Sequence, residues 1–263
     1  MEVRLLDNTS HIKLGCEIHR LCDLFSKGEI RKVLQEALQL QETFPKSAAL
    51  FIIIGDVYTK LKQYNNAIEN YKTGIEIQPN FAHSYFNLGI AFEETGDLET
   101  AIGNYEKAIS LKPNYAEAYH NLGVLLRIKG NKKAAIKKFK TAIRLKPNLA
   151  ESYLNLGLEL RDQGNLEAAI AYFKYAISYK TGYVEAYLNL GDSFRSLGNL
   201  EAAVLSYSDV KTLIQDDTRA HEGIGISIRY YTRATYNGII ERIEKVEELI
   251  EIEQQKLKAC VKE

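Results

Sequence analysis

A block of thirteen residues returns four times along this chain at a constant interval. The copies begin at Tyr85 (YFNLGIAFEETGD), Tyr119, Tyr153 and Tyr187, each 34 residues after the one before, and each keeps Asn-Leu-Gly at the same place. Self-similarity at a fixed period of this length is typical of repeat architectures. In such proteins each unit packs only against its neighbours. The interval therefore favours a stack of like units over a fold with one central core.

Each period has the pattern of two helices joined by a tight turn. In residues 82–115, the apolar residues between Tyr85 and Phe92 are spaced so that they share one helical face. Gly96 then supplies backbone freedom for a turn. A second apolar series over 98–109 follows, and Pro113 ends it, because proline lacks an amide hydrogen and disfavours helix in the residue before it. The unit is predicted to be helix, turn, helix and stop.

Small residues recur where the two helices of a unit are expected to cross. A larger side chain there would hold the backbones apart, so stacked units can bury a continuous core only if these positions stay small. The positions are Gly89, Ala101 and Ala108, then Gly123, Ala135 and Ala142, then Gly157, Ala169 and Ala176, then Gly191, Ala203 and Val210.

The combined pattern, aromatic-x2-Leu-Gly-x2-aromatic, then Ala-x3-aromatic, then Pro, resembles the tetratricopeptide repeat. The resemblance covers about residues 14–217. It implies an all-α fold, namely a right-handed superhelical solenoid of antiparallel helix pairs.

The period also divides the chain. Residues 1–47 are interpreted as an N-terminal segment with a degenerate capping repeat that keeps Gly28 and Pro45. Five repeats are predicted at 48–81, 82–115, 116–149, 150–183 and 184–217, the first departing from the others at Lys62 and Gly74. Residues 218–263 are predicted to hold amphipathic capping helices, including one long C-terminal helix whose glutamates face water.

An asparagine stands in the sixth position of four successive first helices. In the tetratricopeptide family the first helices line a concave groove, so the resemblance implies a ladder of amides along it. Asparagine offers a donor and an acceptor, which suits a peptide backbone. The alternative is that the amides satisfy nearby backbone groups. The four residues are Asn87, Asn121, Asn155 and Asn189.

Two further series flank these asparagines. Arg127, Arg161 and Arg195 occupy the twelfth position and suit carboxylates or phosphates. Their alternative role is pairing with the glutamates at the second position, Glu117, Glu151 and Glu185. An apolar strip on the same face is a candidate source of binding energy or else packs between neighbouring helices. Its members are Phe86, Ile90, Val124, Leu154, Leu158 and Leu188.

Charge is balanced overall but uneven along the chain. Lys plus Arg and Asp plus Glu are both 34, which argues against a general nucleic-acid binder. Residues 127–146 nevertheless carry nine basic residues and no acidic one. This run is a candidate dock for an acidic surface or for the acidic C-terminal helix of another copy. The alternative is a solvated helix face.

Nothing in the chain has the pattern of a catalytic site. The five histidines are scattered, and no zinc-protease, phosphate-loop or nucleophile-elbow motif occurs. The three cysteines have unrelated spacings, which indicates free thiols rather than disulfides or a zinc site. The N-terminus lacks a signal-peptide core and the apolar runs are short, so a cytoplasmic protein without a membrane partner is expected. We expect neither an enzyme nor a cofactor.

Three functions remain open from the sequence. The first is a non-catalytic scaffold that binds an extended peptide or a partner protein in the groove. The second is the substrate-recognition arm of a protein-modifying transferase, since an asparagine ladder resembles the repeat region of O-linked N-acetylglucosamine transferases. The third is a self-assembling scaffold, with homo-oligomers formed through the C-terminal helix.

Overall fold

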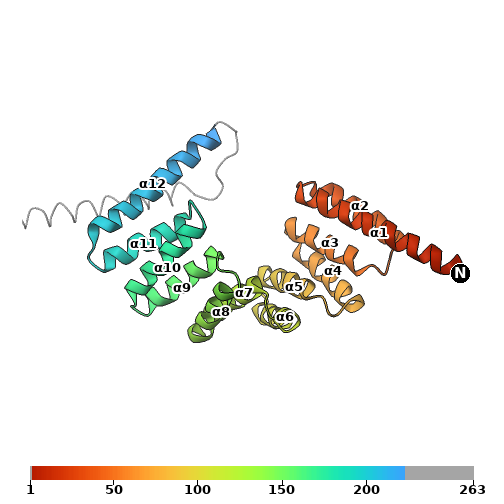
Figure 1. Ribbon diagram of the computed structural model, residues 1–263, viewed down its shortest axis with the longest axis horizontal. Helices are drawn as coiled ribbons and strands as arrows, with labels where there is room; N and C mark the ends of the chain where they lie inside the picture. Colours follow the sequence, from red (N-terminus) through yellow and green to blue (C-terminus); the bar gives the residue numbers. More distant parts are fainter. Residues whose placement is uncertain (1, 223–263) are drawn as a thin grey trace, which may run out of the picture. The chain divides into compact units, whose positions relative to one another are not determined.

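A computed structural model describes residues 2–222, and the regular secondary structure of this part of the chain is all α-helix (Figure 1). It contains twelve α-helices and no strand. Their bounds are α1 (Glu2–Ser26), α2 (Ile30–Thr43), α3 (Ala48–Lys60), α4 (Tyr64–Ile77), α5 (Ala82–Glu94), α6 (Leu98–Leu111), α7 (Ala116–Ile128), α8 (Lys132–Leu145), α9 (Ala150–Asp162), α10 (Leu166–Tyr179), α11 (Val184–Ser196) and α12 (Leu200–Glu222).

The helices pack as pairs, and each pair packs on the next. Within pairs, α3 lies on α4, α5 on α6, α9 on α10 and α11 on α12. Between pairs, α4 lies on α5, α6 on α7, α8 on α9 and α10 on α11. The paired, all-α stacking predicted from the 34-residue period is therefore confirmed.

The chain divides into two compact units, one up to Lys129 and the other from Gly130 onward. The first unit holds α1 to α7 and the second holds α8 to α12. Each has its own buried clusters, such as those around Tyr105 in the first unit and Phe173 in the second. The two units are described separately below.

Glycine permits the close approach of the helices within a pair. A Cβ on Gly89 would lie 2.7 Å from a carbon of the Tyr105 ring, closer than real Cβ contacts occur. The same relation holds between Gly55 and Tyr71, Gly157 and Phe173, and Gly191 and Tyr207. The predicted small residues Ala101 and Ala108 are fully buried. The interpretation of these positions as helix crossings is confirmed.

The turns between paired helices combine a glycine with a capping residue. Gly96, Gly130, Gly164 and Gly198 all have φ between +77° and +84°, the left-handed region that glycine adopts without steric cost. The residue after each glycine caps the next helix. In the first of these turns, for example, Asp97 Oδ1 accepts a hydrogen bond from the backbone N–H of Thr100 at 3.1 Å. The sequence analysis had identified the glycines but not the caps.

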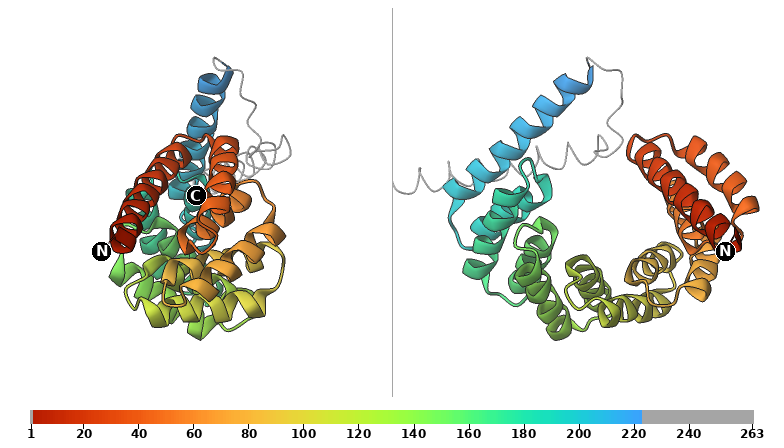
Figure 2. Two further views of the ribbon diagram at one scale, coloured as in Figure 1. Left: turned by 90° about the vertical axis from the view of Figure 1, so that its right-hand side faces the viewer. Right: turned by 45° about the vertical axis from the view of Figure 1, so that its right-hand side comes forward.

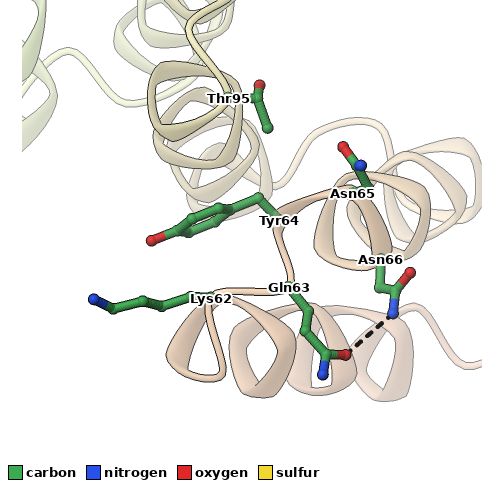
Figure 3. A pocket seen from close by; sticks show the side chains of 6 residues that line it. All are labelled: Lys62, Gln63, Tyr64, Asn65, Asn66 and Thr95. Atoms are coloured by element: carbon green, nitrogen blue, oxygen red, sulfur yellow. Dashed lines mark hydrogen bonds between the residues drawn. The ribbon is translucent and has the colours of Figure 1, made fainter.

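The α3–α4 turn lacks both features. Lys62, the residue that replaces glycine, has φ +59°, and Gln63 makes no capping hydrogen bond to the backbone. The Gln63 side chain instead accepts a hydrogen bond from Asn66 at 3.2 Å, as Figure 3 shows. A hollow of about 320 Å³ opens beside this turn, lined by Lys62, Gln63, Tyr64, Asn65, Asn66 and Thr95 (Figure 3).

The described residues include only the first part of the segment that was predicted to form the C-terminal capping helices. Figure 2 shows α12 as one long helix, and it continues beyond residue 217 to Glu222. The capping helices predicted for the remainder lie outside the described residues. Among the described helices, none combines the length and the apolarity needed to cross a membrane.

Candidate functional site

Asn87 lies within a polar network that joins two successive helix pairs of the first unit. Its Nδ2 donates to Asp56 Oδ1 of α3 at 2.7 Å and lies 3.0 Å from His83 Nε2. Asp56 also accepts a 2.7 Å hydrogen bond from the Tyr71 hydroxyl, and His83 Nδ1 lies 3.1 Å from the Tyr115 hydroxyl. The side chain predicted to meet a ligand thus also links α5 to α3.

The environment of Asp56 makes its carboxyl harder to ionise than that of an exposed aspartate. Burial between the helix pairs raises the pKa of this carboxyl, and the hydrogen bond from Tyr71 offsets part of the rise. The positive charge of His83 and the hydrogen bond from Asn87 act in the same direction as Tyr71. Burial, followed by the Asp56 charge, raises the pKa of Tyr71. The hydroxyl therefore remains a donor at neutral pH.

Asn121 makes an equivalent link from α7 back to α6. Its Nδ2 donates to the Tyr105 hydroxyl at 3.2 Å, and that hydroxyl donates to Glu93 Oε2 at 2.6 Å. Burial raises the pKa of Glu93, while the hydrogen bond from Tyr105 lowers it. Both asparagines of the first unit therefore use their amide N–H groups to connect successive helix pairs.

The asparagines of the second unit bond mainly to their own helices. Asn155 Nδ2 donates to the Glu151 carbonyl at 2.9 Å, and Asn189 Nδ2 donates to the Glu185 carbonyl at 2.7 Å. Asn189 Oδ1 also accepts a hydrogen bond from Arg161 at 2.5 Å, which ties α11 to α9. These contacts correspond to the backbone-bonding alternative considered for the ladder.

Within the described residues, the side-chain carbonyl oxygen of three of these asparagines accepts no hydrogen bond. All four side chains are partly exposed, and each donates through Nδ2. Within the described part of the chain, Oδ1 of Asn87, Asn121 and Asn155 accepts no hydrogen bond. The recurring free group is a carbonyl oxygen, which suits a backbone or side-chain N–H donor.

Arg161 and Arg195 pair within the chain with residues other than the glutamates that the sequence suggested. Arg161 binds the Asn189 amide, and Arg195 lies 3.9 Å from Asp192 Oδ1. Glu151, the expected partner of an arginine, forms an ion pair with Lys180 at 2.9 Å. Arg127 is half-buried and also interacts within the chain. Of the three, Arg195 is the most exposed.

The apolar strip is mostly half-buried. Phe86 and Ile90 pack beside Tyr105 in the first unit, and Phe86 also lies 4.8 Å from the Tyr115 ring centroid. In the second unit, Leu158 and Leu188 pack against separate core clusters.

The two remaining members of the apolar strip differ in their burial. Val124 is half-buried. Leu154 is only 3% exposed and belongs to the core. The prediction that Leu154 faces a ligand is therefore corrected, because neighbouring side chains of its own unit already cover it.

Sequence reasoning missed the acidic residues of this face. Asp56 and Asp192 stand at the ninth position of their first helices, where the middle repeats have Ile90, Val124 and Leu158. The sequence nevertheless contains a pattern that indicates these acidic residues. Each second helix with a tyrosine at the crossing places its hydroxyl on an acid, giving the pairs Tyr71–Asp56, Tyr105–Glu93 and Tyr207–Asp192. The two repeats with Phe139 and Phe173 have no acid at the corresponding positions.

Family models match the region in which this geometry recurs. A model described as TPR repeat matches residues 55–96, 91–127 and 125–160, and one described as tetratricopeptide repeat matches 154–217. The matches run without a gap through the helix pairs from α3 to α12. The chain belongs to the tetratricopeptide repeat family. Such arrays mediate protein–protein interactions, and both matching models describe this repeat alone.

Several relatives of this tetratricopeptide array are known. A probable UDP-N-acetylglucosamine–peptide N-acetylglucosaminyltransferase, SEC of Arabidopsis thaliana, is 27% identical over 73 residues, which is 28% of this chain and 8% of that protein. The chain thus spans less than a tenth of the length of this curated relative. MamA is 27% identical, with a TM-score of 0.57 over 65% of this chain and 94% of the MamA chain.

Two more distant solved structures share the fold. PilF of Pseudomonas aeruginosa has a TM-score of 0.70 at 17% identity, covering 76% of this chain and 90% of its own. YrrB, described as a TPR protein with an unusual peptide-binding site, has a TM-score of 0.55 at 19% identity, covering 72% and 98%. At these identities the likeness supports the tetratricopeptide fold alone.

Proposed function

We propose that the first helices of this tetratricopeptide array bind an extended segment of a partner protein. The observation that carries the proposal is the recurring carbonyl oxygen at the sixth position of the first helices. Asn87, Asn121 and Asn155 are partly exposed, and their Oδ1 atoms accept no hydrogen bond within the described residues. Acceptors that recur in successive repeats can bind the N–H groups of an extended peptide whatever its side chains.

The free energies indicate that the acceptors position a peptide rather than select it. One hydrogen bond contributes about 1 kcal/mol net, whereas ordering one peptide residue costs about 1–2 kcal/mol. Apolar contacts with Phe86, Ile90, Val124, Leu158 and Leu188 would supply further affinity. Arg195, which is exposed beside Asp192, would bind a carboxylate of the ligand.

The proposal also includes the predicted repeat bounds, the superhelix and its two caps. Residues 48–217 form five repeats in a right-handed superhelix whose first helices line a groove, with residues 1–47 and 218–263 as caps. The array acts without catalysis or cofactor, and its ligand is protein rather than nucleic acid or membrane. Free, exposed thiols at Cys16 and Cys22 suit a reducing cytoplasm.

A second candidate is the recognition arm of a protein-modifying transferase. It is favoured by the similarity between this chain and the Arabidopsis N-acetylglucosaminyltransferase. In that case the chain would deliver substrate proteins to a catalytic domain outside these 263 residues. A transferase gene adjacent to this one, with co-purification of the two products, would support this candidate over a freestanding scaffold.

The test uses peptides selected by display against the folded chain. Replacing Asn121 and Asn155 by alanine should weaken the binding of selected peptides by about tenfold or more, if each lost hydrogen bond contributes about 1 kcal/mol. A matched control replaces Asn70 and Asn104, whose amides bond backbone carbonyls on second helices. Calorimetric titration should show unchanged affinity for this control. Equal affinities for both double variants would refute the proposal.

A further inference from the structure

One face of α8 carries a continuous stripe of positive charge. Lys133, Lys137, Lys140 and Arg144 are spaced by four, three and four residues, so they share a helical face, and all four are exposed. With Ile136 and Thr141 they line an open hollow of about 350 Å³. We call these four residues the basic stripe.

Within residues 2–222, the basic stripe has no ion-pair partner. Like charges three and four residues apart on a helix destabilise it. Lys132 and Lys133 also lie in the first helical turn, where the helix dipole disfavours cations and where α8 has no acidic residue. None of the four stripe residues forms an ion pair with the described part of the chain. Among the described residues, therefore, no ion pair relieves the repulsion between the cations of α8.

The other repeats show that the fold does not need these charges. The corresponding positions are Asn65, Glu69, Lys72 and Glu76 in α4, Glu99, Gly103, Glu106 and Ser110 in α6, Glu167, Ala171, Lys174 and Ser178 in α10, and Glu201, Leu205, Ser208 and Thr212 in α12. None of these sets has more than one basic residue. Since the same backbone tolerates neutral or acidic residues here, the stripe is better explained by an acidic occupant.

The chain contains a segment of matching chemistry. Glu241, Glu244, Glu248 and Glu251 are spaced by three, four and three residues, and they alternate with Ile243, Val246 and Ile250. On a helix such spacing would align four carboxylates with the four cations of the stripe. We infer that the basic stripe of α8 binds the acidic segment 239–253 of a second copy of this chain.

A second copy is the better source of the segment for two reasons. The formal net charge of the chain is zero, so no long-range repulsion opposes the association of two copies. Within one chain, α9, α10 and α11 follow one another between α8 and α12 in the stack. Three helices therefore separate the stripe from α12 within one chain.

Charge reversal in the full-length chain tests this inference. The stripe variant carries Lys133→Glu, Lys137→Glu and Lys140→Glu, and the segment variant carries Glu241→Lys, Glu244→Lys and Glu248→Lys. Sedimentation equilibrium should show that the wild type self-associates and that each variant alone has a dissociation constant raised by about tenfold or more. Mixing the two variants should restore association. A control with Arg31→Glu, Lys46→Glu and Lys62→Glu should associate like the wild type.

A second measurement identifies the contact. Carbodiimide couples neighbouring lysine and carboxylate side chains without a spacer, so a mixture of ¹⁴N and ¹⁵N chains should yield light–heavy cross-links between the stripe and the segment. A wild type that stays monomeric, cross-links only within single chains, or normal association of the stripe variant would each overturn the inference. Because α8 is a second helix, these outcomes leave the peptide-binding proposal for the first helices untouched.

Discussion

At the scale of single residues, glycine at the helix crossings has a testable energetic role. Tyr105 is fully buried and its hydroxyl is held by Glu93, so its ring is not free to move away from a Cβ 2.7 Å distant on residue 89. We expect Gly89→Ala to lower the free energy of unfolding by about 1–3 kcal/mol, because the packed ring must shift. Urea denaturation followed by circular dichroism measures this change.

The matched control for this prediction is another helical glycine of the same repeat. Gly103 lies inside α6, and a Cβ there would meet no atom within 4 Å. Gly103→Ala should therefore raise the free energy of unfolding by about 0.5–1 kcal/mol, since alanine restricts the unfolded chain. Destabilisation by both substitutions would show that the contact with Tyr105 is not the cause.

Asp56 should give the protein an unusual pH dependence. Because burial raises its pKa in the folded state, the folded chain holds the proton more tightly than the unfolded chain, whose carboxyl has a pKa of about 3.9. The stabilising contribution is complete below the unfolded value and is lost as pH rises through the raised folded value. Relative to Asp56→Asn, the wild type should therefore gain stability as pH falls from 7 towards 4.

Urea denaturation of both proteins at several pH values measures this difference. The charges of His83 and Lys60 also act on the Asp56 carboxyl and lower its pKa. The comparison is therefore repeated with His83→Gln in both proteins. A difference between wild type and Asp56→Asn that stays constant with pH, or that changes in the opposite direction, would contradict the prediction.

At the scale of elements, the turn between paired helices explains part of the stability of each repeat. Four turns place a glycine in the left-handed region and then an Asp or Asn that caps the next helix, as Asn165 does for the Ala168 N–H at 3.3 Å. The α3–α4 turn instead places Lys62 at φ +59° and follows it with a residue that does not cap. A lysine side chain in this region is strained.

Rebuilding the α3–α4 turn should therefore stabilise the first unit. We expect Lys62→Gly combined with Gln63→Asn to raise the free energy of unfolding by about 1–2 kcal/mol, through relief of backbone strain and a new cap. Removing an existing cap in another turn, by Asn165→Ala, should lower the free energy of unfolding by about 1 kcal/mol. Thermal and urea denaturation measure both. A neutral or destabilising double substitution would mean that Lys62 has contacts that outweigh the strain.

At the scale of the whole molecule, the stability of each helix pair should depend mainly on the pairs that it contacts. Helix pairs contact their immediate neighbours, and the chain divides into two compact units. In such arrays the free energy is approximately a sum of repeat and nearest-neighbour contributions. A destabilising change in one unit should therefore open that unit first.

Hydrogen exchange of the backbone amides can show whether a destabilising substitution opens only its own unit. In the Gly89→Ala variant, backbone amides of α5 and α6 should exchange faster, while those of α10 and α11 change little. The Gly191→Ala variant, with its own clash against Tyr207, should show the reverse pattern. Uniform acceleration along the chain in both variants would indicate one cooperative unit instead.

The sequence by itself determined the helix pairs, their period and the close crossings. These features depend on local properties, namely helical spacing of apolar residues, glycine at turns and small residues where helices meet, and each repeats visibly at 34 residues. It also contained the Tyr–acid pairs, although they were recognised only once Tyr71 and Asp56 were seen in contact.

Only the tertiary structure decided which groups of the candidate site are available. Asn87 and Asn121 hold identical positions in their repeats, yet one donates to Asp56 and the other to Tyr105, while Leu154 is covered and its repeat equivalent Leu188 is not. These outcomes depend on side chains from other helices and neighbouring repeats, as far as 31 residues away. A periodic pattern specifies where a residue stands, whereas its exposure and its free hydrogen-bonding groups are set by the non-periodic neighbours that stacking brings against it.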